Sequence, residues 1–112
     1  MRALVVMIVF AASAAVEARA ARCTITSPEQ PTYRGPCDFI ADRNGSFGIL
    51  PIGRDTFFPQ IIGISFEITK PGVGDVRGLT SFGINSRWGT AIRSRRNPAC
   101  WTGADFTICV YR

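Results

Sequence analysis

Four arginines gather in one short stretch of the chain: Arg87, Arg93, Arg95 and Arg96. A guanidinium group can bind phosphate, sulfate or carboxylate through two parallel hydrogen bonds, so this stretch is the first candidate for a binding site. If Trp88, Thr90 and Ile92 face inward on a strand, the arginines at 87, 93 and 95 share its outer face, with Arg96 just beyond. We expect this row to contact an anionic glycan, a glycolipid or an acidic protein. The alternative is a solvated edge strand whose charges prevent aggregation.

Adjacent aromatic residues form the second candidate site. Phe57 and Phe58 lie between Gly53 and Pro59, in a stretch typical of a loop. Two exposed rings there would bind a sugar or a protein partner, whereas core packing is the alternative for either ring. This pair, or the turn at residues 83–86, could also insert into a secreted hydrolase. Inhibition of a lysozyme or a protease is therefore the second functional hypothesis.

The residues needed for catalysis are poorly represented. The chain has no histidine, which removes the usual general base, the Ser-His and Cys-His pairs and every histidine-containing metal site. Asp38 and Asp42 share a strand face, but four residues of strand separate them by about 13 Å, beyond the roughly 5 to 9.5 Å of glycosidase carboxylates. We expect a protein that is not an enzyme and that holds neither a metal nor another cofactor.

The four cysteines are expected to form two disulfides. In a small exported domain, Cys23, Cys37, Cys100 and Cys109 allow three connectivities. Their local spacing favours Cys23 with Cys37 and Cys100 with Cys109, and a cross-pairing such as Cys37 with Cys109 is the alternative. The first bridge would close a loop of about 15 residues, worth roughly 3 kcal/mol by the chain-entropy estimate.

The first 20 residues have the three parts of a secretory signal peptide. Arg2 is followed by an apolar run over residues 4–16 and by the small-residue cleavage site Ala18-Arg19-Ala20. The uncharged run is shorter than the roughly 20 residues of a membrane-spanning helix. We predict a signal peptide over 1–20, a single disulfide-stapled domain over 21–112, no membrane span, and a secreted or periplasmic location. Eleven basic and seven acidic residues remain after cleavage, a formal charge of +4.

The elements that position these residues are predicted to be strands. Helical periodicity is missing after the leader, and 11 glycines and 7 prolines interrupt the chain. Alternation of Ile62, Ile64, Phe66 and Ile68 with small or polar residues predicts a strand with one buried face. The fold class is therefore all-β, a small antiparallel sandwich or barrel of about six to eight strands.

Turn residues divide the chain between these strands. Asn44-Gly45 predicts a type I′ hairpin, and the segment from Lys70 to Val73 predicts a type II turn. Gly78 suggests a bulge in the returning strand. A last hairpin, centred between Ala104 and Asp105, would place Cys100 opposite Cys109. Residues 24–36 hold three prolines and are expected to form an irregular loop.

Two short motifs resemble a known family in their spacing. Gly45-Ser46-Phe47 follows a cysteine-bearing strand, and Trp88-Gly89-Thr90-Ala91 comes later in the chain. This loose spacing is similar to that of bacterial periplasmic inhibitors of C-type lysozyme. The loop residues that carry inhibition in that family have no counterpart here, so no functional residue is transferred.

The sequence thus favours a non-catalytic binding module over an enzyme. The arginine-rich strand would contact an anionic envelope component or an acidic protein. Nucleic acid is not expected as a partner, because neither a recognition helix nor a base-stacking motif is present.

Overall fold

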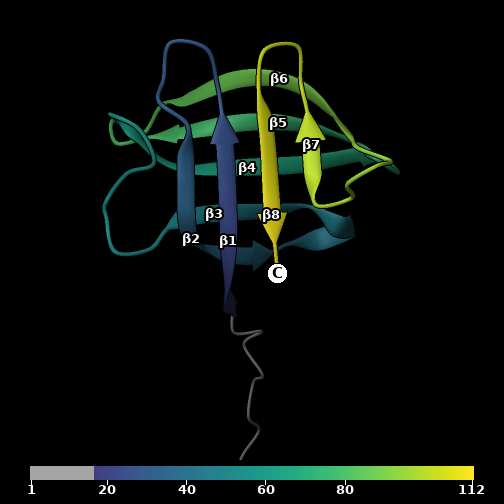
Figure 1. The fold of residues 1–112 in the computed structure, drawn as a ribbon, viewed down its shortest axis with the longest axis horizontal. Coiled ribbons are helices and arrows are strands. Elements are labelled where there is room, and N and C mark those ends of the chain that lie inside the picture. The colour runs from purple at the N-terminus through teal and green to yellow at the C-terminus, as the bar shows by residue number, and fades with distance from the viewer. Residues whose placement is uncertain (1–16) are drawn as a thin grey trace, which may run out of the picture.

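The computed structural model describes residues 17–112, and these form an eight-stranded antiparallel barrel (Figure 1). Each strand pairs with its neighbour in the chain, and the first strand pairs with the last, which closes the sheet. This confirms the all-β prediction. The elements are β1 (Ala18–Thr26), β2 (Tyr33–Ala41), the 3-10 turn η1 (Arg43–Gly45), β3 (Phe47–Pro51), β4 (Ile61–Lys70), β5 (Val73–Thr80), β6 (Asn85–Arg93), β7 (Cys100–Thr102) and β8 (Thr107–Tyr111).

Because successive strands run in opposite directions, the connections alternate between two ends of the barrel (Figure 1). One end, which we call the mouth, carries residues 42–46, the turn at 71–72, the loop 94–99 and the end of β8. The opposite end carries the loops 27–32, 52–60, 81–84 and 103–106. The start of β1 lies at the mouth.

The inner side of the barrel is filled by alternate residues of the strands. Ile64 and Phe66 of β4 are buried, as predicted, and they pack with residues such as Ile25 and Ile108 from across the barrel. Ile62 is exposed instead of buried. The register of β4 against β5 shifts between Ile61 and Gly63, and this extra residue turns Ile62 outward.

Both disulfides form as the local spacing predicted. The bridge from Cys23 to Cys37 joins β1 to β2, and the bridge from Cys100 to Cys109 joins β7 to β8. Cys100 and Cys109 are directly opposite in the β7–β8 ladder, which confirms the predicted register of the last hairpin. The cross-pairing is excluded.

The predicted turns form with one difference in size. Asn44 and Gly45 both have positive φ, 57° and 79°, as the hairpin required. However, the Asp42 N–H donates to the Ser46 carbonyl at 2.8 Å, so the turn encloses the three residues of η1 and is not a two-residue type I′ turn. At the next hairpin Lys70 pairs with Val73, and Gly72 has φ of 74°, which fits the predicted type II turn.

The prediction of an irregular loop over residues 24–36 is wrong. β1 continues to Thr26 and β2 begins at Tyr33, so the connection is only residues 27–32. Pro36 lies within β2, opposite Arg22. It sits one residue beyond the last β2–β3 pair, Cys37 with Pro51, where proline's missing N–H removes no bond to β3.

Most of the predicted signal peptide lies outside the described residues. Its last residues, Ala18 to Ala20, extend β1 and pair with β2. The pairs that close the barrel begin at Arg22 with Tyr111, so a chain that starts at Ala21 retains all of them. Within residues 17–112, no helix is long and apolar enough to cross a membrane.

Candidate functional site

Strand β6 does not present its predicted face to solvent. Ala91 is fully buried and Ile92 is 62% exposed, so the assignment of Trp88, Thr90 and Ile92 to the inside is wrong for the end of the strand. The cause is a bulge: Val76 of β5 pairs with Gly89, and the next residue of β5 pairs with Arg87. Trp88 is the extra residue between them. The bulge expected near Gly78 is therefore present, but its extra residue belongs to β6.

This bulge separates the four arginines. Arg87 lies on the outer face of the barrel, directly opposite Arg77 of β5. Arg93 follows the buried Ala91 by two residues and therefore points to the inner side, at the mouth. Arg95 and Arg96 are exposed in the loop between β6 and β7. The structure thus brings Arg93, Arg95 and Arg96 to the mouth and leaves Arg87 on the barrel wall.

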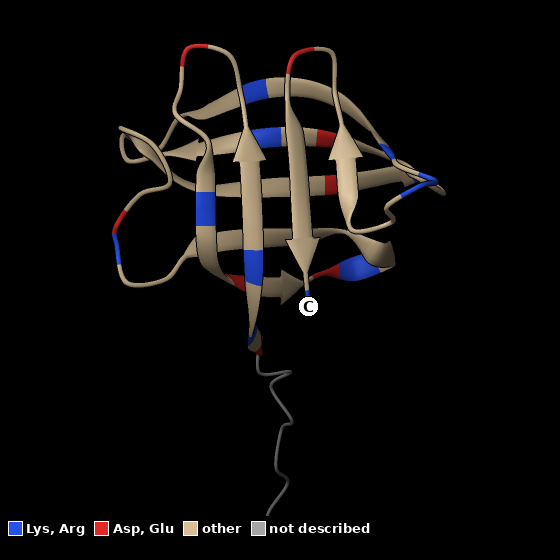
Figure 2. Cartoon of the chain, viewed as in Figure 1, with Lys and Arg blue, Asp and Glu red and all other residues tan. Residues whose placement is uncertain are grey.

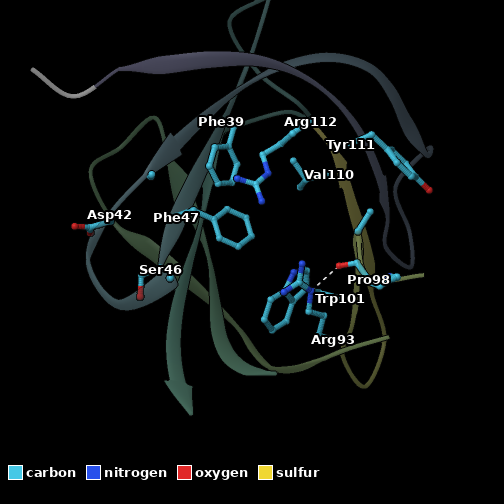
Figure 3. A pocket seen from close by; sticks show the side chains of 13 residues that line it. Phe39, Asp42, Ser46, Phe47, Arg93, Pro98, Trp101, Val110, Tyr111 and Arg112 are labelled. Atoms are coloured by element: carbon cyan, nitrogen blue, oxygen red, sulfur yellow. Dashed lines mark hydrogen bonds between the residues drawn. The ribbon is translucent and has the colours of Figure 1, made fainter. Parts of the chain in front are cut away.

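A cavity of about 730 Å³ opens at the mouth (Figure 3). Its aromatic wall is built by strands far apart in sequence: the rings of Phe47 on β3 and Trp101 on β7 have centroids 6.3 Å apart. The buried Phe66 of β4 stacks on Phe47 from the core, with ring centroids 4.3 Å apart. The labelled side chains that surround the cavity are Phe39, Asp42, Ser46, Phe47, Arg93, Pro98, Trp101, Val110, Tyr111 and Arg112.

The Arg93 side chain is fixed by two contacts. Its Nε–H donates to the Pro98 carbonyl at 2.6 Å, and its Cζ lies 5.7 Å from the centre of the Trp101 ring (Figure 3). A guanidinium has five N–H donors, and the bond to Pro98 uses one of them. The remaining donors belong to a side chain that is already held in place.

Arg112 is a second guanidinium at the same cavity. Its Cζ lies 4.7 Å from the centre of the Phe39 ring, and its side chain reaches into the cavity beside Val110 (Figure 3). Arg112 was not among the candidate residues predicted from the sequence. Alternation along β8 contains the signal, because Ile108 and Val110 are buried and Arg112 is the next residue on their face.

The mouth is strongly basic. Its three connections contain one acidic residue, Asp42, whose carboxylate accepts a hydrogen bond from the backbone N–H of Arg43 at 2.7 Å. Arg93 and Arg112 line the cavity, and other basic residues lie on the elements at this end of the barrel. These others include Arg43, Lys70, Arg95 and Arg96. Figure 2 shows basic segments at this end. A concave site in which positive charge predominates attracts ligands of negative charge.

The aromatic pair Phe57 and Phe58 is not an exposed platform. The two side chains are 2% and 3% exposed, so that prediction is wrong. Phe57 packs edge-to-face on Tyr33 with ring centroids 4.8 Å apart, and Phe58 forms a bridge with Ile61. Both rings are part of the hydrophobic core, reached from the loop 52–60 at the end opposite the mouth. The other predicted insertion element, the turn at residues 83–86, is exposed.

The described residues offer little to a metal. Within residues 17–112, no three side chains of Cys, Asp or Glu are grouped so that they could hold an ion. All four cysteines are in disulfides. The donors that converge at the mouth are guanidinium groups, which bind anions and not cations.

Comparison of the chain with protein-family models, with curated protein sequences and with solved structures finds no match. The geometry of the barrel itself is therefore the basis for inferring its function.

Proposed function

We propose that this protein is a non-catalytic binding protein, exported to the periplasm or the cell exterior, whose barrel mouth binds an anionic group. The ligand classes are those expected from the sequence: an anionic glycan, a glycolipid or an acidic protein. The observation that carries the proposal is the convergence of Arg93 and Arg112 on one cavity. Arg95 and Arg96 extend the positive charge over its rim.

The arrangement suits an anion because the two guanidinium groups are ordered before a ligand arrives. Each stacks on an aromatic ring, and Arg93 is also tied to the Pro98 carbonyl. Pre-ordered donors lose less side-chain entropy on binding, and their fork geometry matches phosphate, sulfate or carboxylate. A partly apolar wall also strengthens the attraction by lowering the local dielectric constant.

The cavity also limits the size and character of the bound group. Its volume of about 730 Å³ falls within the range of small-molecule sites, roughly 300 to 1,000 Å³. Phe39, Phe47 and Trp101 offer apolar contact beside the two charges. We infer that the ligand presents one anionic group joined to a sugar ring or another apolar body, such as the end of a glycan or a glycolipid head group.

Export is supported by the disulfides together with the predicted leader. Both pairs of cysteines are cross-linked, and such bridges persist in oxidising compartments such as the periplasm and the extracellular space.

Charge removal at the mouth tests the proposal. Binding of a sulfated oligosaccharide and of a phosphorylated oligosaccharide is measured by calorimetry at low and high salt. We expect Arg93→Gln and Arg112→Gln each to weaken binding about tenfold, because a charge-assisted bidentate contact contributes roughly 1.5 to 3 kcal/mol. Binding should also weaken as salt rises.

Arg87→Gln is the matched control, because it removes the same charge from the barrel wall. Its affinity for the ligand should stay within about twofold of that of the unchanged protein, as expected for a surface charge that does not contact the ligand. Binding that is insensitive to salt, or that falls equally in all three variants, would contradict a site at the mouth. Urea unfolding of each variant checks that the barrel stays folded.

A further inference from the structure

The connection between β5 and β6 exposes two large apolar side chains. Phe82 is 72% exposed and Ile84 is 71% exposed, the highest values among the large hydrophobic residues of the described chain. They lie at the tip of a hairpin at the end opposite the mouth (Figure 1). Exposed side chains of this size, side by side, mark an interaction surface more often than chance.

The tip is held in shape by its own hydrogen bonds. The Gly83 N–H donates to the Thr80 carbonyl at 3.1 Å, and Gly83 has φ of 78°, a conformation that suits glycine. The Thr80 hydroxyl bonds to the backbone of Ile84 on the other side of the turn. The Ser81 N–H donates to the Gln60 carbonyl at 2.9 Å, which ties the tip to the loop 52–60. Phe82 and Ile84 are thus presented by an ordered turn.

Two basic residues lie behind the tip, and the nearest acidic residue along β5, Asp75, lies farther from the tip than they do. Arg77 and Arg87 are directly opposite each other on the outer face of β5 and β6, and the next partner across the sheet is Ser65. Like charges in that position repel. The chain contains no Asp or Glu from Val76 to Ala104, a stretch that includes the whole tip. The hairpin between Arg77 and Arg87 therefore carries positive charge alone, which favours a negatively charged partner.

We propose that this hairpin docks the protein on an anionic lipid bilayer, with Phe82 and Ile84 inserted at the interface and Arg77 and Arg87 on lipid phosphates. The surface has the two components of interfacial binding, an apolar edge and adjacent basic residues. The docking is independent of the ligand site at the mouth, which lies at the other end of the barrel.

The distances along the hairpin fit this arrangement. Arg87 is four residues from Gly83, about 14 Å along an extended strand. The head-group layer of a bilayer is roughly 5 to 8 Å thick, and an arginine side chain can extend several ångströms to reach a phosphate. With the tip at the acyl boundary, both guanidinium groups can reach the phosphates. The acidic residues at this end of the barrel, Glu29, Asp55 and Asp105, lie in the loops 27–32, 52–60 and 103–106 and not in the tip itself.

The test is sedimentation of the oxidised protein with vesicles of phosphatidylglycerol and phosphatidylcholine, or of phosphatidylcholine alone. We expect binding to the anionic vesicles and little to the neutral ones. The double variant Phe82→Ser/Ile84→Ser should bind at least about tenfold more weakly, because two apolar side chains lose their burial at the interface. Arg77→Gln and Arg87→Gln should each lose about fivefold, and only on anionic vesicles.

Two control variants separate the tip from general hydrophobicity and charge. Ile92→Ser changes an exposed isoleucine at the far end of the same strand, and Arg34→Gln removes an exposed arginine from β2. Both should bind vesicles as the unchanged protein does. Arg93→Gln should also bind them normally, so that failure of the mouth proposal would not affect this result.

Insertion itself is measured with Phe82→Trp. Bromine atoms on the lipid acyl chains should quench the fluorescence of this variant more than that of the parent protein, whose tryptophans are Trp88 and Trp101. Equal binding to both kinds of vesicle, or unchanged binding of the Phe82→Ser/Ile84→Ser variant, overturns the proposal. No binding to either vesicle overturns it too.

Discussion

The two ends of the barrel are closed in opposite ways. At the mouth, the inner rows of β6 and β8 change from apolar to basic: Arg93 follows Ala91, and Arg112 follows Val110. The result is a cavity with guanidinium groups on aromatic rings. At the other end, the loop 52–60 inserts Phe57 and Phe58 into the core. The comparison shows that one barrel can have an end built for packing and an end left open for a ligand.

Phe57 and Phe58, which close the end opposite the mouth, should contribute more to the free energy of unfolding than the residues of the mouth. Phe57→Ala removes a buried ring that packs on Tyr33, and we expect the free energy of unfolding to fall by about 3 to 5 kcal/mol. Arg93→Ala at the mouth should cost far less, about 1 kcal/mol, since its side chain is exposed and contacts one carbonyl and one ring. Urea unfolding followed by tryptophan fluorescence measures both. Equal losses of unfolding free energy in the two variants would contradict this difference in stability between the two ends.

The bulge in β6 should have an intermediate effect, because it determines which arginines reach the mouth. A Cβ on Gly78 would lie 2.7 Å from Nε1 of Trp88, the bulged residue. We expect Gly78→Ala to displace that ring and to destabilise the barrel by about 1 to 3 kcal/mol. Gly53→Ala is a loop control with no heavy atom within 4 Å of the added Cβ, although its φ of 77° adds some strain.

The same pair of variants sharpens the comparison of the two ends. If the bulge sets the direction of Arg93, Gly78→Ala should also weaken the ligand affinity at the mouth, whereas Gly53→Ala should not. Calorimetry with the sulfated oligosaccharide measures this. Unchanged affinity in Gly78→Ala would show that Arg93 is positioned by Pro98 and Trp101 alone.

The smallest effect is expected on the barrel wall. Arg87→Gln removes a like-charge contact with Arg77 and should stabilise the fold by up to about 0.5 kcal/mol. The gain should shrink as salt rises, because the charges are exposed. Chemical unfolding at two salt concentrations measures it. A loss of stability would indicate that the two guanidinium groups are held by an anion or by stacking.

The sequence predicts the fold more fully than the site, for physical reasons. The turn at Gly72 and the spacing of the cysteines are local signals that the structure confirms, and the alternation in β4 is confirmed at Ile64 and Phe66 but not at Ile62. The faces of β6 depend on Trp88, which becomes the extra residue where its ring lies against Gly78 of the neighbouring strand. A period of two read along one strand contains no information about that cross-strand contact.

The aromatic residues illustrate the same limit. Phe57 and Phe58 occupy a loop in the sequence and the core in the structure, because the loop folds back and the Phe57 N–H donates to the Ile61 carbonyl. Local composition cannot separate a ring that binds a partner from one that closes a barrel. Arg112 could have been found, since it continues the buried row of Ile108 and Val110 on β8.

The order of the strands has a consequence for how the chain folds. Seven of the eight strand pairings join neighbours in the sequence, and only the pairing of β1 with β8 joins distant segments. Long-range pairing slows folding, because a large loop must close before its contacts form. Each disulfide links one of these two strands to its neighbour. Under oxidising conditions, the final closure of the barrel therefore joins two hairpins that are already covalently tied.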